Sequence, residues 1–237
     1  MRGFFSLDGP LYSFLSKMAD FLILNVLFIV CSLPVFTIGA SYTAMSYVTL
    51  KMKEGDEGYV FKSFFKSFKE NFRQGTGMWM ICLAVGFVLG IDLYILHNGE
   101  GTYVSVMKVA VLAALVVWFM VVSWAFPLLS RFVNTVKVTL HNALLLSMGN
   151  APRALAFTFG CFASVYVSLY NAQTLSIGLL LWLMFGFSVL SFLNSSLQYK
   201  QFKMLMPEEK QEITSDMDFR IGDETEDPAD SDPDKTE

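Results

Sequence analysis

Five long apolar runs dominate the sequence and constrain the fold more than any other feature. They cover residues 21–40, 78–96, 103–126, 154–170 and 174–193. Each has roughly the ~20 residues that an α-helix needs to cross about 30 Å of hydrocarbon. The runs do not alternate apolar and polar residues, so spanning strands are not expected. The sequence therefore predicts an all-α, polytopic transmembrane helix bundle with about five spans.

The composition is typical of a membrane protein, and the charge differs between the body of the chain and its C-terminal tail. Hydrophobic residues make up 54% of the sequence and charged residues 16%, against about 25% charged in a soluble domain. Residues 207–237 hold thirteen acids and three bases; because the whole chain carries −4, residues 1–206 carry +6. We therefore predict an N-terminal segment (1–20), a membrane domain (21–200) and an acidic, disordered tail (207–237).

Basic residues predict how the chain crosses the membrane. Links rich in Lys and Arg alternate with links that have none, and basic links stay in the cytoplasm. The basic ones carry Lys51, Lys53, Lys62, Lys66, Lys69 and Arg73, then Arg131, Lys137 and Arg153, then Lys200 and Lys203. Five crossings of the cell (cytoplasmic) membrane place the C-terminus in the cytoplasm and the N-terminus outside. Alternatively, residues 21–50 form a re-entrant pair, which places the N-terminus inside.

A Phe-rich basic segment, YVFKSFFKSFKENFRQ, occupies residues 59–74. Its phenylalanines recur at helical spacing and form one face, whereas Lys62, Lys66, Lys69 and Arg73 lie on the flanks and back. This pattern is typical of a helix that lies in a membrane interface. We predict a cytoplasmic interfacial helix whose four bases contact anionic lipid headgroups. In the alternative, its Phe face packs against the protein's own helices.

Two prolines interrupt the apolar pattern. Pro34 lies inside the first run with Gly39 close behind it, and Pro127 follows the third run. Proline lacks a backbone donor, and a broken helix in a membrane needs protein or water to satisfy the freed groups. Each proline therefore marks either a site or a plain helix end. The two segments that follow are similar in order, which indicates either a parallel internal repeat or chance.

Three polar residues in or directly after the apolar runs are further candidates. Asn25 lies in the first run, Asp92 near the outer end of the second, and Asn194 at the inner end of the fifth. Polar groups in membrane helices either bond neighbouring helices or serve function. Asp92 either reaches water or forms a proton or cation site with His97.

The sequence contains no motif for catalysis, for phosphate binding or for a metal site. Its three cysteines are far apart and lack metal-ligand spacing. We therefore expect no catalytic residue, cofactor or metal, and no nucleic-acid partner. The expected partners are membrane lipids with anionic headgroups, and either transporter subunits or a second copy of the chain.

Residues 24–75 resemble the YesL-like family of bacterial membrane proteins. The resemblance rests on Cys31-Ser32-Leu33-Pro34, Thr37-Ile38-Gly39-Ala40, Glu57-Gly58-Tyr59, Phe64-Phe65, Phe68 and Asn71-Phe72. It implies a small polytopic protein of a family without an established role, whose members are suspected of working beside carbohydrate uptake systems. The expected function is therefore a non-enzymatic accessory or regulatory protein of the membrane; the alternative is a small transporter or channel in its own right.

Overall fold

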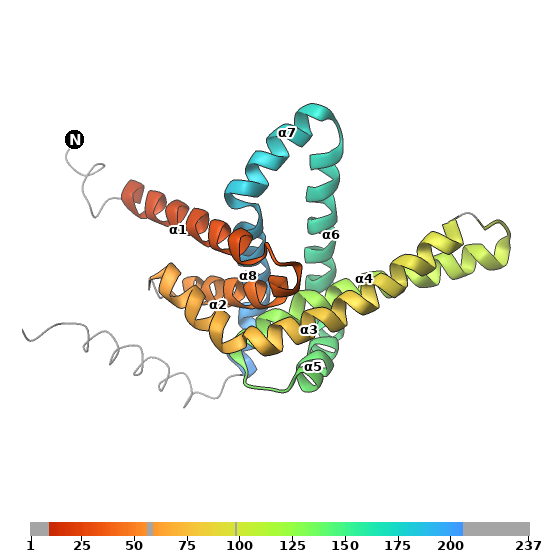
Figure 1. Ribbon diagram of the computed structural model, residues 1–237, viewed down its shortest axis with the longest axis horizontal. Helices are drawn as coiled ribbons and strands as arrows, with labels where there is room; N and C mark the ends of the chain where they lie inside the picture. Colours follow the sequence, from red (N-terminus) through yellow and green to blue (C-terminus); the bar gives the residue numbers. More distant parts are fainter. Residues whose placement is uncertain (1–9, 56–58, 98, 206–237) are drawn as a thin grey trace, which may run out of the picture. The chain divides into compact units, whose positions relative to one another are not determined.

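The computed structural model describes residues 10–55, 59–97 and 99–205, and every regular element in them is helical (Figure 1). Residues 1–9 of the predicted N-terminal segment (1–20) and the predicted acidic tail 207–237 lie outside the described residues. The chain divides into a unit of residues 1–198 and a second unit of residues 199–237. The elements are α1 (Pro10–Cys31), η1 (Val35–Thr37), α2 (Ile38–Glu54), α3 (Val60–His97), α4 (Thr102–Arg131), α5 (Val136–Gly149), α6 (Ala151–Leu169), α7 (Ala172–Leu181), the π-helical η2 (Trp182–Gly186) and α8 (Phe187–Leu205).

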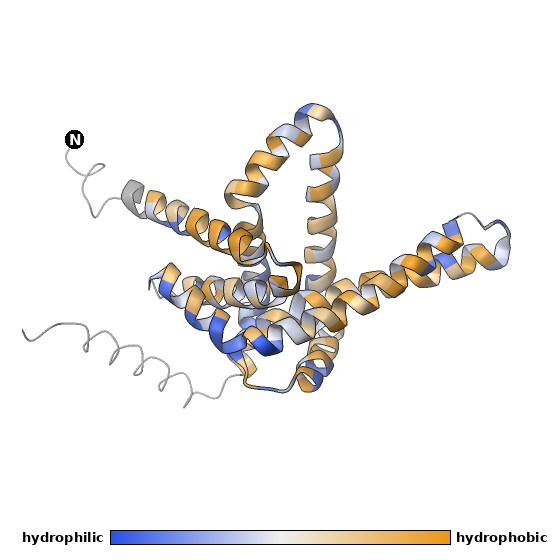
Figure 2. Ribbon diagram, viewed as in Figure 1, coloured by the Kyte–Doolittle hydropathy of each residue, from blue (hydrophilic) through white to orange (hydrophobic). Residues whose placement is uncertain are grey.

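The predicted all-α bundle with five spans is confirmed. Five described helical segments are long and apolar enough to cross a membrane (Figure 2). They are Phe14–Cys31, Val60–His97, Thr102–Arg131, Ala151–Leu169 and Ala172–Leu205. Their outward-facing side chains are mostly large hydrophobic residues, which water would not solvate favourably. The chain is therefore a multi-pass membrane protein.

The predicted first span, residues 21–40, is wrong in its bounds. Residues 10–20 are not a separate segment but the start of α1, which ends at Cys31. The chain then reverses, so that α1 and α2 form a helical hairpin (Figure 1). The Thr37 hydroxyl lies 2.6 Å from the carbonyl oxygens of both Cys31 and Pro34, and the Trp79 indole N–H donates to the Val35 carbonyl. These bonds satisfy the backbone that Pro34 interrupts.

The predicted interfacial segment is helical but is not a separate helix. Residues 60–97 form the single 38-residue helix α3, about 57 Å long at 1.5 Å per residue. No proline separates the two predicted elements, and Gly75 and Gly77 do not stop the helix. Because α3 exceeds the ~30 Å of hydrocarbon, it either tilts or projects beyond it.

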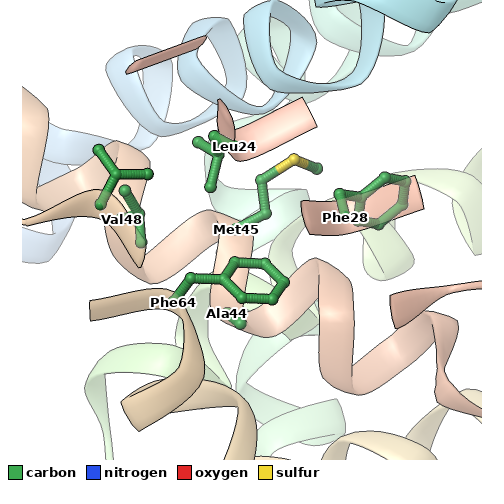
Figure 3. Packing of buried hydrophobic residues seen from close by; sticks show 7 residues of the cluster. Leu24, Phe28, Ala44, Met45, Val48 and Phe64 are labelled. Carbon is green, nitrogen blue, oxygen red and sulfur yellow. The ribbon is translucent and has the colours of Figure 1, made fainter. Parts of the chain in front are cut away.

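The Phe face of α3 packs against the protein in part. Phe64 is buried in a cluster with Leu24 and Phe28 of α1 and with Met45 of α2 (Figure 3). Phe65 and Phe68 pack at the edge of the same cluster. The N-terminal half of α3 is thereby held beside the apolar helix α1, as the alternative to a purely interfacial face predicts.

The other predicted spans agree with helices and differ at their ends. Run 78–96 is the second half of α3, 103–126 lies in α4 and 154–170 overlaps α6. Run 174–193 comprises α7, η2 and the start of α8. Pro127 does not end α4, which continues to Arg131. A proline in a helix costs less here because other side chains satisfy the carbonyl it leaves free, as described below.

We expect the α2–α3 contact to depend on Gly39. A Cβ at this position would collide with the carbonyl oxygen of Gly75 and lie 2.5 Å from the Cβ of Trp79. Gly39→Ala should therefore lower the free energy of unfolding in detergent by about 1–3 kcal/mol. Gly77→Ala is the matched control, since nothing lies within 4 Å of its Cβ position. Equal stability of the two variants would contradict this contact.

Candidate functional site

The candidate site lies where Pro127 interrupts the hydrogen bonds of α4. Proline has no N–H to offer the carbonyl four residues earlier, which belongs to Ser123. Two side chains of α8 donate to this carbonyl instead of the missing N–H. The Asn194 Nδ2 lies 2.8 Å from the Ser123 oxygen, and the Gln198 Nε2 lies 3.0 Å from it. All four residues are buried. The free carbonyl of α4 thus becomes a bond between two helices.

The two amides also bind each other and reach α2. Gln198 donates its second hydrogen to the Asn194 Oδ1 at 2.7 Å, and Asn194 donates its second to the Tyr42 hydroxyl oxygen at 3.2 Å. Burial raises the pKa of Tyr42, although its bond to Asn194 acts the other way, so the phenol stays protonated. The site therefore joins α2, α4 and α8 through neutral groups.

Gln198 leaves one acceptor without a partner. Its side chain is 1% exposed, both amide hydrogens are used, and the Oε1 has no hydrogen-bond partner among the described residues. Exchanging the oxygen and nitrogen would place two oxygens against each other at Ser123. The Gln198 Oε1 can therefore accept one more hydrogen bond or contact a cation.

Hydroxyl groups extend the contact between α2 and α8. The Thr49 Oγ1 lies 2.7 Å from the Ser195 Oγ and 3.3 Å from the Ser191 Oγ. All three are buried; Thr49 lies about two turns along α2 from Tyr42, whereas Ser191 and Ser195 lie within one turn of Asn194 in α8. These neutral contacts join α2, which carries several small and hydroxyl-bearing residues, to α8 in the interior.

Asn25 performs a similar role for the π-helical turn η2. Its Nδ2 donates to the carbonyls of Trp182 at 3.1 Å and Leu183 at 2.8 Å, and its Oδ1 accepts from the Ser188 N–H at 3.0 Å. A π-helical turn departs from the regular α-helical ladder. The Asn25 side chain of α1 therefore forms hydrogen bonds with the backbone groups that this irregular segment leaves available.

An ion pair lies near the ends of α2 and α4. The Arg131 Nη2 lies 2.6 Å from the Glu54 Oε2, and the Arg131 guanidinium lies 5.6 Å from the centre of the Tyr47 ring. Arg131 is one of the bases used above to predict orientation. In the structure it also connects the two helices.

The structure brings together only some of the candidate residues. Asn194 serves the carbonyl that Pro127 leaves free, and Asn25 bonds a different helix. Pro34 lies exposed in the α1–η1 connection, Gly39 lies at the α2–α3 crossing, and Asp92 is exposed on α3. The predicted headgroup contacts Lys62, Lys66, Lys69 and Arg73 are all exposed on α3.

Sequence reasoning did not identify Tyr42 and Ser123 as members of one site with Asn194 and Gln198. Ser123 had a usable signal, since it lies four residues before Pro127 and must lose its helical donor. Nothing local in the sequence marks Tyr42 as their neighbour. Within residues 10–55, 59–97 and 99–205, no group of three His, Cys, Asp or Glu side chains is placed to hold a metal.

Comparison with known proteins gives one family. The profile described as "Protein of unknown function, DUF624" matches residues 21–93, which include the block 24–75 that carries the resemblance noted above. This range covers α2, half of α1 and most of α3, and is less than half of the chain. No curated protein and no solved structure matches the chain. The chain is thus similar over this part to a family of unknown function.

A double-mutant cycle tests the proline-dependent contact. Asn194→Leu should cost about 1–2 kcal/mol of unfolding free energy in detergent, because it removes a donor from the buried Ser123 carbonyl. In a Pro127→Ala background it should cost less, since the restored N–H can satisfy that carbonyl within α4. Asn71→Leu is the control, because Asn71 bonds only within α3 to Ser67 among the described contacts. Strict additivity of Asn194→Leu and Pro127→Ala would exclude the coupling.

Proposed function

We propose that the protein is a non-enzymatic accessory or regulatory component of the cytoplasmic membrane that works beside a carbohydrate uptake system. The observation that carries the proposal is the chemistry of the interior. Among the described residues, the fully buried polar residues are all Ser, Thr, Asn or Gln, and the one largely buried charged side chain that an ion pair places there, Arg131, is neutralised by Glu54. Such groups bond helices to one another, whereas acid–base catalysis uses groups that titrate. The link to carbohydrate uptake comes only from the family resemblance.

The arrangement of polar groups supports a role in which helices hold or change position. The side-chain amides donate to backbone carbonyls of other helices; they belong to Asn25, Asn194 and Gln198. Bonds of this kind in a membrane are worth about 0.6–2 kcal/mol each. A partner that binds the bundle needs only modest energy to break one of them. An accessory subunit can transmit its state in this way.

A gene deletion with complementation tests the accessory role. Loss of the protein should lower uptake of a carbohydrate while the transporter subunits remain in the membrane. Both the wild type and Asp92→Asn should restore uptake, because the proposal gives the exposed Asp92 no part. Normal uptake of every carbohydrate tested would contradict the proposal.

A small transporter or channel is the second candidate, and the unpaired Gln198 oxygen favours it. A buried acceptor next to a proline-interrupted helix is a suitable place for a passing solute or cation. The purified protein alone in liposomes would then conduct a solute, and Gln198→Leu would abolish this flux. Flux that survives Gln198→Leu but not Asp92→Asn would instead support the acidic site predicted from the sequence.

We further propose an orientation in which the start of α3 and the N-terminus share the cytoplasmic side. The α1–α2 hairpin returns the chain to the side from which α1 starts, and positive links stay inside. The basic residues of α3, Lys62, Lys66, Lys69 and Arg73, then face anionic headgroups of the inner leaflet. In this arrangement the apolar α1 enters the membrane and α2 returns from it, so the pair adds no net crossing. Two crossings by α3 and α4 and two by α6 and α7–α8 then bring the chain back to the cytoplasmic side.

Cysteine labelling in intact cells tests this orientation. In a background that carries Cys31→Ala, Cys82→Ala and Cys161→Ala, Lys66→Cys should resist a membrane-impermeant maleimide until the cells are opened. Glu100→Cys should react at once, because Glu100 is exposed in the link between α3 and α4. The reverse pattern of reactivity would overturn the orientation.

A further inference from the structure

An open groove lies on the surface of the first turns of α3. It is shallow, has a volume of about 630 Å³, and is lined by Phe61, Lys62, Phe65, Lys66 and Lys69. Phe61 is 61% exposed, and its ring centre lies 4.8 Å from that of Phe65. Two adjacent aromatic rings thus form an apolar surface that the described part of the chain leaves uncovered.

Three ammonium groups border this surface. Lys62, Lys66 and Lys69 follow one another at four and three residues, so their side chains lie along one side of the helix. All three are exposed. Glu70, the one acid in residues 60–77, is not among the lining residues. An occupant that complements the groove therefore carries negative charge and an apolar body.

The packing of α1 brings this groove to the depth of lipid. Phe64, between the lining residues, is buried against Leu24 and Phe28 of α1. The other side of α1 exposes large hydrophobic residues, among them Phe14, Val26 and Val30, which require a lipid environment. A helix of about 57 Å also fits a bilayer of about 40–45 Å, headgroups included, when it tilts. The lysines then lie at headgroup level.

We propose that this groove binds one anionic phospholipid. Its phosphate lies between neighbouring lysines, Lys62 and Lys66 or Lys66 and Lys69, and an acyl chain covers the rings of Phe61 and Phe65. This differs from a helix that lies flat on many lipids with its whole Phe face, because Phe64 is already used by α1. The binding site does not depend on the proposed accessory role.

Native mass spectrometry of the full chain in detergent tests this site. The protein is mixed with equal amounts of phosphatidylglycerol and phosphatidylcholine, and retained lipid is counted. We expect the wild type to retain phosphatidylglycerol in at least tenfold excess over phosphatidylcholine, because each lysine near the phosphate raises the affinity roughly fivefold. The triple variant Lys62→Gln/Lys66→Gln/Lys69→Gln should lose this preference. Lys137→Gln, which removes an exposed lysine from α5, should keep it.

Two further variants distinguish lipid binding from a folding defect. The triple Lys→Arg variant should retain phosphatidylglycerol, because it keeps the positive charge that the phosphate requires. Phe61→Ser should shorten retention of the lipid, because it removes part of the apolar surface. Undiminished retention by the Lys→Gln variant, or full displacement of the lipid by inorganic phosphate, would overturn the proposal. The assay uses the purified chain alone, so its outcome is independent of any effect on carbohydrate uptake.

Discussion

The need to give every backbone polar group a hydrogen-bond partner away from water governs this structure. An unsatisfied N–H or C=O in hydrocarbon costs several kcal/mol, so an irregular helix persists only where another group serves it. Within the described residues the irregularities include Pro34, Pro127 and η2. At each, a side chain from another helix donates to the backbone: Trp79, the Asn194–Gln198 pair, and Asn25.

Two of these three contacts involve helix α8 or the η2 turn that precedes it. Asn25 holds η2 to α1, and Asn194 with Gln198 holds α8 to α4 and α2. Movement of α8 would therefore expose carbonyls of α4 and η2 together. Neutral amides suit this purpose, because they hold helices together without the desolvation cost of a buried charge.

The sequence predicts the spans well because hydropathy is a local property. It predicts helix ends less well, because these depend on contacts: α3 continues through residues 75–77, where Gly75 lies against Ala40 of α2. Asn25 and Asn194 were identifiable as polar residues in apolar runs. Their partners were not, since the Trp182 and Ser123 carbonyls are selected by the packing of distant helices.

Helix α2 shows why hydropathy alone undercounts the helices of such a bundle. It carries buried Ser41, Thr43, Ser46 and Thr49 and is not one of the apolar candidate spans. Because α1, α3 and α4 pack around it, its hydroxyl groups meet protein and not lipid, and Thr43 and Thr49 bond carbonyls of their own helix. The apolar requirement thus applies to surfaces that face lipid, and a helix shielded by its neighbours is free to carry polar contacts.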